Sequence, residues 1–487
     1  MELGHGQWSG WVVCTLGVSG QLRCVSGVFV FERFRKTAGI GLGWGGKGGV
    51  VTGRAGYWWC YSAMRESKRS KSQVDLHAKV FYDEAMLQKF VFGSFLWSAI
   101  SIQAVDFEPW SFTEKDLFPS ALISTATVDW NGDEETAEDK KVQGDPKLKR
   151  DEVAIYGDEN GWLAVELTDL PPKSEVRVEI SVDGFMKPSV WEGVLKKAHT
   201  TARIFPKGIW DYAALHTVRE QRPVNATFKV TVNGEELTEK TEVCTMKSIN
   251  DCPFYVLFDE EGEEFEDFSM VFAAYVNENH PWVDGILKDA LKTGLVSGFT
   301  GYQSGDPDEV LTQVFAIWKV LQDRGIKYSD ISTTTPSKYV VSQTVRFLDD
   351  SIDATQANCV DGTVLMASLM RKIGLNVYLT MVPGHCLLAF DLGREEDDDI
   401  LGLETTMLGE TDLGEAGESI EVPEGVKGTK HEGSFRVLAA ALGVGTATLE
   451  EHSEAMANEE SPDTQLISVA AAREMGIMPI ASGRDRK

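Results

Sequence analysis

The segment that begins at Cys359 constrains the fold more than any other part of the chain. From Cys359 onward, apolar residues recur with the i, i+4, i+7 spacing of a buried helix, and Gly374 ends the run. Residues 375–382 then read as a buried strand, Pro383-Gly384 as a turn and residues 385–391 as a second strand. A helix followed directly by two strands that a turn connects predicts a domain of mixed helix and sheet.

Three side chains in and after this segment are of the types that form a nucleophilic site. Cys359 falls at a helix N-terminus, where unpaired backbone N–H groups and the helix dipole favour the thiolate that attacks carbonyl carbon. His385 begins the second strand, and Glu404 lies on a third predicted strand at residues 400–408. If the second and third strands form a hairpin, Glu404 lies beside His385 and orients its imidazole. The three residues would then supply a nucleophile, a base and an orienting acid.

Residues of this site also have ordinary structural interpretations. Cys359 alone would read as an inert buried thiol, since free cysteines are among the most buried residues. Asp361 suits the first turn of the helix, but its charge close to the cysteine disfavours a thiolate. Cys386 reads as a buried strand residue that points opposite to His385, because side chains alternate along a strand.

Two glutamines that precede the cysteine are candidates for stabilising an oxyanion. The side-chain amide of Gln343 or Gln356 would donate alongside backbone N–H groups, although both also fit surface glutamines. No spacing of cysteines and histidines resembles that of a structural zinc site. We therefore expect neither a metal nor another cofactor.

Three phrases of the sequence, ANCVDGTVLMASLMRKIGL, VPGHCLLAF and LETTMLGE, resemble in order and spacing the transglutaminase-like superfamily, in particular its uncharacterised bacterial branch. The resemblance extends over residues 318–408. It implies a papain-like α+β core, in which the cysteine helix packs on an antiparallel sheet that carries the histidine and the acid. The sequence departs from the family pattern in two places. Glu404 replaces the usual Asp, and Cys386 stands where a small or aromatic residue is common.

The resemblance also implies a reaction. The thiolate of Cys359 would attack an amide carbonyl of a peptide or protein substrate, His385 would transfer the proton, and water or an amine would resolve the thioester. Resolution by water is the reaction of a peptidase or amidase, and resolution by an amine is that of a protein crosslinker. The alternative is a catalytically inactive member of the family that serves as a scaffold or an envelope interaction protein.

Residues 118–258 carry short alternating runs of the kind that form strands. Turn signals such as Asn160-Gly161, Asp183-Gly184 and Asn233-Gly234 separate them. The expected strands are residues 121–128, 163–167, 176–182, 201–205, 226–232 and 255–258. The pattern predicts an antiparallel β-sandwich, immunoglobulin-like in architecture, that binds a partner or packs against its neighbour.

Residues 265–480 form the predicted cysteine domain. Apolar stripes at a spacing of 3.6 predict helices at residues 282–291 and 308–321, and helical character returns at residues 435–442 and 465–475. The expected fold class is therefore α+β, with the cysteine domain following the β-sandwich. The sequence predicts no particular oligomeric state.

Charge and cysteine content bound the partners of the protein. Residues 1–85 hold 11 Lys and Arg against six Asp and Glu, whereas the rest of the chain holds 36 against 69. Such an acidic chain repels nucleic acid and anionic lipid and favours basic partners. Cys244 and Cys252, with seven residues between them, are a candidate disulfide for an exported protein, and two separate thiols are the alternative.

The opening of the chain does not fit a globular domain. Residues 1–60 contain 15 of the 46 Gly and five of the 13 Trp, and no hydrophobic period runs through them. From Met86 a charged start, a mainly apolar stretch of 13 residues and a small residue at Ala104 form the pattern of a secretory signal peptide, residues 86–104. We therefore expect residues 1–85 to be a disordered upstream extension that is not native. The remainder would be exported to the periplasm or the outside of a bacterial cell.

N-terminal sequencing of the native protein tests this interpretation, and a mature end beyond Ala104 is the expected result. An apolar stretch of 13 residues is too short to span a bilayer, so we expect no transmembrane helix in the mature protein. An internal buried helix or strand is the alternative for residues 86–104, and the protein would then be cytoplasmic. A mature end upstream of Met86 would contradict the signal peptide.

Overall fold

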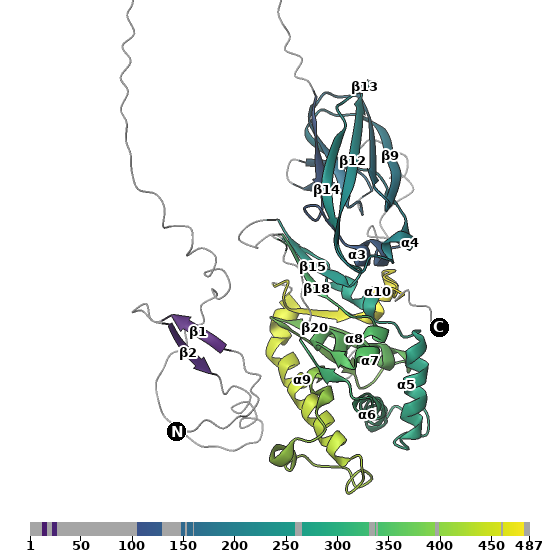
Figure 1. Ribbon diagram of the computed structural model, residues 1–487, viewed down its shortest axis with the longest axis vertical. Helices are drawn as coiled ribbons and strands as arrows, with labels where there is room; N and C mark the ends of the chain where they lie inside the picture. The colour runs from purple at the N-terminus through teal and green to yellow at the C-terminus, as the bar shows by residue number, and fades with distance from the viewer. Residues whose placement is uncertain are drawn as a thin grey trace, which may run out of the picture. The chain divides into compact units, whose positions relative to one another are not determined.

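The computed structural model describes residues 12–16, 22–26, 105–128, 148–150, 153–158, 160–258, 265–330, 337, 339–394, 399–458 and 461–481 (Figure 1). The chain divides into two compact units, residues 1–98 and 99–487. In the first unit β1 (Val12–Leu16) and β2 (Leu22–Ser26) form an antiparallel pair. Part of the segment expected to be disordered is thus a strand pair, in which Val and Thr favour the extended backbone. The predicted signal peptide, residues 86–104, lies outside the described residues.

Two sheets occupy the first part of the second unit. One sheet holds, in spatial order, β3 (Phe107–Ser111), β7 (Leu163–Leu170), β10 (His199–Phe205), β6 (Val153–Gly157) and β5 (Leu148–Arg150). The other holds β11 (Ile209–Trp210), β9 (Met186–Leu195), β8 (Ser174–Val182), β12 (Arg222–Val232), β14 (Lys240–Met246) and β4 (Asp116–Leu117), with β13 (Glu235–Glu236) beside β12. Alternate residues of β8 are buried, as in a strand with one face on a core. Buried residues of both sheets join one apolar cluster, so the sheets share a core.

This arrangement departs from the sequence expectation in two ways. The pairs β10–β6 and β14–β4 are parallel, so neither sheet is wholly antiparallel. The segment predicted as a strand at residues 121–128 is instead the end of α3 (Pro119–Ser124) and a turn, because Pro119 at the first helical position favours a helix start. The immunoglobulin-like architecture of residues 118–258 stays a prediction.

The rest of the second unit contains most of the helices. The described helices there are η2 (Ser269–Tyr275), α5 (Pro281–Lys292), α6 (Pro307–Asp323), α7 (Leu348–Ala354), α8 (Cys359–Lys372), η3 (Thr405–Gly409), η4 (Gly414–Gly417), α9 (Glu432–Asn458) and α10 (Val469–Glu474). A four-stranded antiparallel sheet has the order β22 (Ile400–Leu403), β21 (His385–Asp391), β20 (Val377–Val382) and β23 (Gln465–Ser468). Smaller sheets join β16 (Phe265–Asp267), β15 (Asp251–Leu257) and β18 (Val340–Thr344), and β17 (Lys327–Tyr328) with β19 (Gln356–Ala357).

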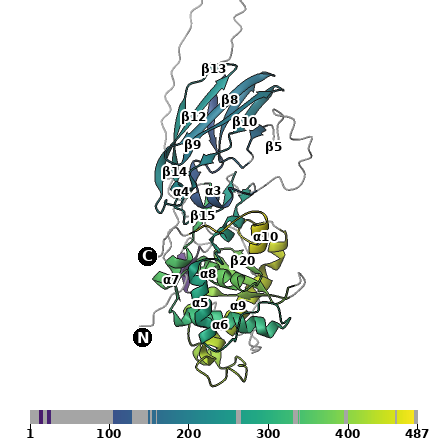
Figure 2. The ribbon, with the colours of Figure 1, turned by 90° about the vertical axis from the view of Figure 1, so that its right-hand side faces the viewer.

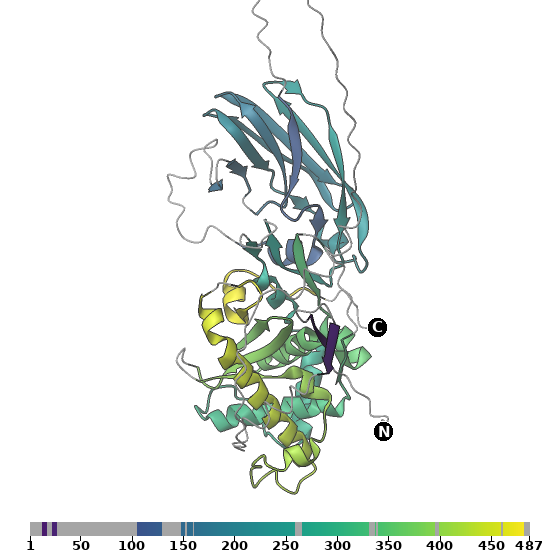
Figure 3. The ribbon, with the colours of Figure 1, turned by 90° about the vertical axis from the view of Figure 1, so that its left-hand side faces the viewer.

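The four-stranded sheet supports the cysteine helix. Helix α8 packs against β20 and β21, and α5 and α6 pack on α8 (Figure 2). Helix α9, the long yellow-green helix of Figure 3, packs along β22 and β21. Six of the seven residues of β21 are buried, which requires cover on both faces of the strand. The molecule is thus a mixed α+β protein with several antiparallel sheets.

The elements around Cys359 agree with the periodicity of the sequence. Helix α8 ends at Lys372. Gly374 follows it with a φ of +86°, a left-handed conformation that glycine commonly adopts after a helix. Strand β21 has the predicted bounds. Residues 465–475, expected to be helical, begin instead with β23, because residues 465–468 pair with β20 before α10 starts. In the part of the chain that the structure describes, no helix is both long and apolar enough to cross a membrane.

The backbones of β22 and α9 touch at two glycines, and this contact is testable. A Cβ atom at Gly402 would lie 2.2 Å from the carbonyl carbon of Gly445. We expect Gly402→Ala to lower the free energy of unfolding by about 1–3 kcal/mol, because strand and helix would have to separate. At Gly443 a Cβ atom meets nothing within 4 Å, so Gly443→Ala is the control and should stabilise the helix by about 0.5–1 kcal/mol. Urea unfolding compares the two variants, and equal stability would contradict the contact.

Candidate active site

A reciprocal cap fixes the start of α8 and makes Cys359 its first residue. The side-chain oxygen of Asn358 accepts from the backbone N–H of Asp361 at 2.8 Å, and the carboxylate of Asp361 accepts from the N–H of Asn358 at 3.1 Å. Among the described residues, no acceptor reaches the backbone N–H groups of Cys359 and Val360. The half-buried cysteine therefore lies beside two free donors at a helix N-terminus.

Arg346 holds Asp361 from the side of β18 and α7. The side chain of Asp361 is completely buried and accepts from the backbone N–H of Arg346 at 2.8 Å and from its Nη1 at 3.3 Å. Burial raises the pKa of Asp361, although the hydrogen bonds from Arg346 and Asn358 partly counter this effect. Three donors thus orient the carboxyl group toward the cap and the arginine: the backbone N–H of Asn358, and the backbone N–H and Nη1 of Arg346.

His385 and Glu404 form the hydrogen-bonded pair that the sequence predicts. His385 follows the turn at Gly384, whose φ is +72°, and opens β21. Its Nε2 lies 2.7 Å from Oε2 of Glu404. Burial disfavours the imidazolium, but the interactions with Cys359 and Glu404 outweigh burial and raise the pKa of His385 to about 10. The three side chains are therefore contiguous.

Glu404 reaches this position from a turn and not from the predicted strand at residues 400–408. Strand β22 ends at Leu403, and Glu404 is the N-cap of the 3-10 helix η3. Its Oε1 accepts from the backbone N–H of Thr406 at 3.1 Å and from the hydroxyl of Thr406 at 2.5 Å. Burial opposes ionisation of this carboxyl, but the bonds from His385 and Thr406 prevail and lower its pKa. Each carboxylate oxygen of Glu404 therefore has its own partner.

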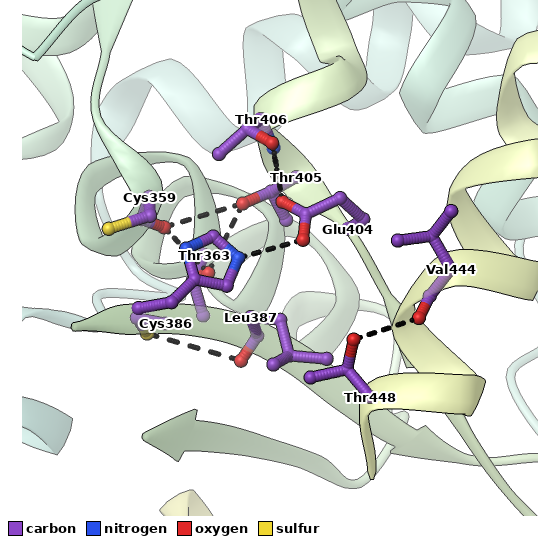
Figure 4. Close-up of polar contacts among 10 residues, drawn as sticks. Cys359, Thr363, Cys386, Leu387, Glu404, Thr405, Thr406, Val444 and Thr448 are labelled. Carbon is purple, nitrogen blue, oxygen red and sulfur yellow. Dashed lines mark hydrogen bonds and ion pairs between the residues drawn. The ribbon is translucent and has the colours of Figure 1, made fainter. Parts of the chain in front are cut away.

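Two threonines join η3 to the first turns of α8 (Figure 4). The backbone oxygen of Cys359 accepts from the hydroxyl of Thr363 at 2.8 Å and from that of Thr405 at 3.3 Å. A Cβ atom at Gly362 would lie 3.0 Å from Oγ1 of Thr405, so glycine allows the close approach. The hydroxyl of Thr405, the residue that follows Glu404, thus connects η3 to the backbone oxygen of Cys359.

Tyr328 is a site residue that the sequence did not reveal. The two-residue strand β17 pairs in parallel with β19, which places Tyr328 opposite Ala357, two residues before the cysteine. Burial and then the charges of Cys359, Asp330 and Glu404 raise the pKa of its phenol, although the residue is 46% exposed. A strand this short leaves no periodic signal, so only the fold brings Tyr328 to the site.

A second thiol lies close to the nucleophile. Cys386 is buried, as expected of a strand residue there, and burial raises its pKa well above the ordinary value. Its sulfur lies 4.0 Å from the backbone oxygen of Leu387, and the charge of Cys359 further raises its pKa. Cys386 thus places another sulfur on a strand that packs against the cysteine helix.

Among the described residues, neither candidate glutamine is hydrogen-bonded to Cys359. The amide of Gln343 donates to the backbone oxygen of Thr344 on its own strand at 3.0 Å. Gln356 contributes its backbone oxygen as an acceptor for Nη1 of Arg346 at 3.4 Å. The free backbone N–H groups of Cys359 and Val360 belong to the cysteine itself and to the next residue, where an oxyanion would form.

The candidate disulfide between Cys244 and Cys252 is not formed. Both residues are free buried thiols, and they lie on β14 and β15 in different sheets. Burial raises the pKa of Cys244 to about 11 and that of Cys252 well above its ordinary value. Cys244 and Cys252 are therefore two separate thiols, which is the alternative that the sequence left open.

A cavity of about 790 Å³ lies near this region but does not include the three site residues. Arg219, Asp251, Arg346 and Asp350 are among its lining residues. Arg346 links it to the cap of α8 through Asp361. Among the described residues, no group of three or more His, Cys, Asp or Glu is placed to hold a metal ion.

Comparison with models of protein families, with curated proteins and with solved structures finds no match for this chain. The geometry around Cys359 therefore carries the functional argument. It brings together a helix-terminal thiol, an imidazole and a buried carboxylate, and the imidazole is hydrogen-bonded to the carboxylate.

The ionisation of His385 is a measurable consequence of this arrangement. The charge on His385 stabilises the folded protein, and this contribution is fully present below a pH of about 6.5, the ordinary pKa of histidine. This stability is lost as the pH rises through about 10. We expect the titration midpoint of His385, followed by NMR, to lie near pH 10 and to fall in Glu404→Gln. The loss of unfolding free energy in His385→Ala should be larger at neutral pH than above pH 10. A midpoint near 6.5 in the unmodified protein would contradict the geometry.

Proposed function

We propose that the protein is a thiol acyl-transfer enzyme of the transglutaminase-like type, built on a papain-like core. The observation that carries this proposal is the row of Cys359, His385 and Glu404, with 2.7 Å between the imidazole and the carboxylate. A nucleophile in contact with a base that a third group orients is the arrangement that activates thiols for attack on carbonyl carbon.

The first step is attack of the Cys359 thiolate on the carbonyl carbon of an amide in a peptide or protein. The developing oxyanion would accept hydrogen bonds from the free N–H groups of Cys359 and Val360, at the positive end of the α8 dipole. His385, protonated at neutral pH, gives its proton to the nitrogen of the leaving amine. The products of this step are a thioester on Cys359 and a free amine.

The second step releases the acyl group. Neutral His385 takes a proton from water or from an incoming amine, which attacks the thioester carbon and expels the thiolate. Glu404 stays ionised throughout and holds the imidazole by Nε2 while Thr406 holds the other carboxylate oxygen. Water yields a carboxylic acid, and an amine yields a new amide bond.

Substrate and compartment follow from the charge and the opening of the chain. The many carboxylates beyond residue 85 favour basic peptides or proteins and disfavour nucleic acid. The signal-peptide pattern of residues 86–104 supports export to the periplasm or the outside of a bacterial cell. Tyr328, exposed beside the cysteine, offers a flat surface to the substrate chain.

Alkylation kinetics test the activation of the thiol. We expect iodoacetamide to label Cys359 rapidly at a pH near 6, because the proposed mechanism requires a thiol that the helix N-terminus and His385 activate. His385→Ala should remove this reactivity at low pH, whereas Cys386→Ala should retain it, since Cys386 is buried. Peptide mapping assigns the label. Labelling of Cys359 at the rate of an ordinary free thiol would support an inactive scaffold.

Turnover is tested with a protein substrate and a fluorescent primary amine. We expect the unmodified protein to cleave amide bonds of the substrate or to attach the amine to it, and Cys359→Ala to do neither. Glu404→Gln should reduce kcat by about 10²–10⁴, since the imidazole would lose its orienting charge, and Glu404→Asp should lose less. Equal product formation by Cys359→Ala and the unmodified protein would refute the proposed nucleophile.

A further inference from the structure

A second cavity lies in the two-sheet part of the chain, and its walls come from both sheets. Its volume is about 520 Å³, within the range of about 300–1,000 Å³ that small-molecule sites occupy. Ile180 and Met186 come from β8 and β9 of one sheet, and Leu163 comes from β7 of the other. Further lining residues come from α3 and the turn after it, from between β6 and β7, and from the segment that runs from the end of β10 to Tyr212. The cavity thus sits where strand ends meet loops.

Aromatic rings and aliphatic groups form much of its surface. Trp162, Trp210 and Tyr212 line it together with the buried side chains of Leu122 and Ile180. The indole of Trp210 lies so close to Gly208 that a Cβ atom there would come within 2.5 Å of its Nε1. Tyr212 is 41% exposed. A ligand that enters would find flat apolar surfaces on a rigid support.

The polar groups of the same wall have hydrogen-bonding capacity to spare. One carboxylate oxygen of Asp158 accepts from the N–H of Asn160 at 3.2 Å, and the amide nitrogen of Asn160 donates to the oxygen of Val128 at 3.5 Å. In the described part of the chain, no partner reaches the other carboxylate oxygen of Asp158, the amide oxygen of Asn160, the indole N–H of Trp210 or the hydroxyl of Tyr212. A ligand can therefore donate to the oxygens of Asp158 and Asn160 and accept from the indole N–H of Trp210. With the hydroxyl of Tyr212 it can do either.

The charge of the wall narrows the class of ligand. Among the described residues that line it, Asp158 and Lys207 are the charged ones, and their formal charges balance. A phosphate or nucleotide would need more than one cation, and a polyamine more than one carboxylate. A neutral molecule with hydroxyl groups along its edge and C–H groups on its face fits this wall. Its hydroxyl groups would bond the spare donors and acceptors, and its C–H face would pack on the aromatic rings.

We propose that this cavity binds a neutral saccharide, with a sugar ring against Trp210 or Tyr212 and sugar hydroxyls bonded to Asp158 and Asn160. The inference does not depend on the thiol site. It gives the two-sheet part of the chain a ligand of its own.

Calorimetric titration of the full chain tests this proposal with cellobiose, maltose and N,N′-diacetylchitobiose, which cover β-linked glucose, α-linked glucose and an N-acetylated sugar. Saturable binding of at least one of them is expected. Sorbitol, which has hydroxyl groups but no ring face, should not bind. Trp210→Ala and Asp158→Asn should each weaken binding at least about tenfold, since each removes a principal contact.

Tyr328→Ala is the matched control, because Tyr328 is as exposed as Tyr212 but lies at the thiol site. Its saccharide affinity should equal that of the unmodified chain. Near-ultraviolet circular dichroism verifies that the variants fold, and Asp158→Asn keeps the size of the side chain if Trp210→Ala does not fold. The proposal is overturned if none of the three disaccharides saturates, if sorbitol binds equally well, or if folded Trp210→Ala and Asp158→Asn bind like the unmodified chain.

Discussion

The candidate active site depends on the docking of η3 onto the first turns of α8. The backbone oxygen of Cys359 accepts two threonine hydroxyls, one from its own helix and one from η3, and Gly362 leaves the space for this approach. Glu404 is the residue immediately before η3, so the same contact that fixes the cysteine carbonyl also places the carboxylate. The packing of α9 on β22 supports it from the other side, where the N–H of Glu404 donates to the oxygen of Ala441 at 3.0 Å.

Two buried carboxyl groups lie near the thiol, and their surroundings give them different tasks. Asp361 faces the helix cap and Arg346, and burial raises its pKa, which limits its repulsion of a thiolate. Glu404 has its pKa lowered by donors from His385 and Thr406, so it stays charged and stabilises the imidazolium. When the surroundings of two neighbouring acids shift their pKa values in opposite directions, the two carboxyl groups can take different roles. Asp361 thus belongs to the helix cap, and Glu404 is the acid in contact with the imidazole.

The sequence predicts local elements well where one period runs long enough. Helix α8 and strand β21 agree with their apolar patterns, and the order of Cys359, His385 and Glu404 indicates the site before any coordinates. Tyr328 and the hydroxyl contacts of Thr405 could not be predicted, because they depend on a two-residue strand and a single 3-10 turn. The strand expected at residues 121–128 is wrong because an alternating pattern over only eight residues does not outweigh the helix start that Pro119 favours.

The position of Glu404 explains why a glutamate can serve where the resemblance leads one to expect aspartate. Strand β22 ends one residue earlier, so the backbone of Glu404 has already turned away from the ladder beside β21. The extra methylene lets Oε2 reach His385 at 2.7 Å while Oε1 caps η3 through Thr406. An aspartate at the same backbone position would have a shorter reach for both partners at once. Side-chain length and the turn at the end of β22 therefore compensate for each other.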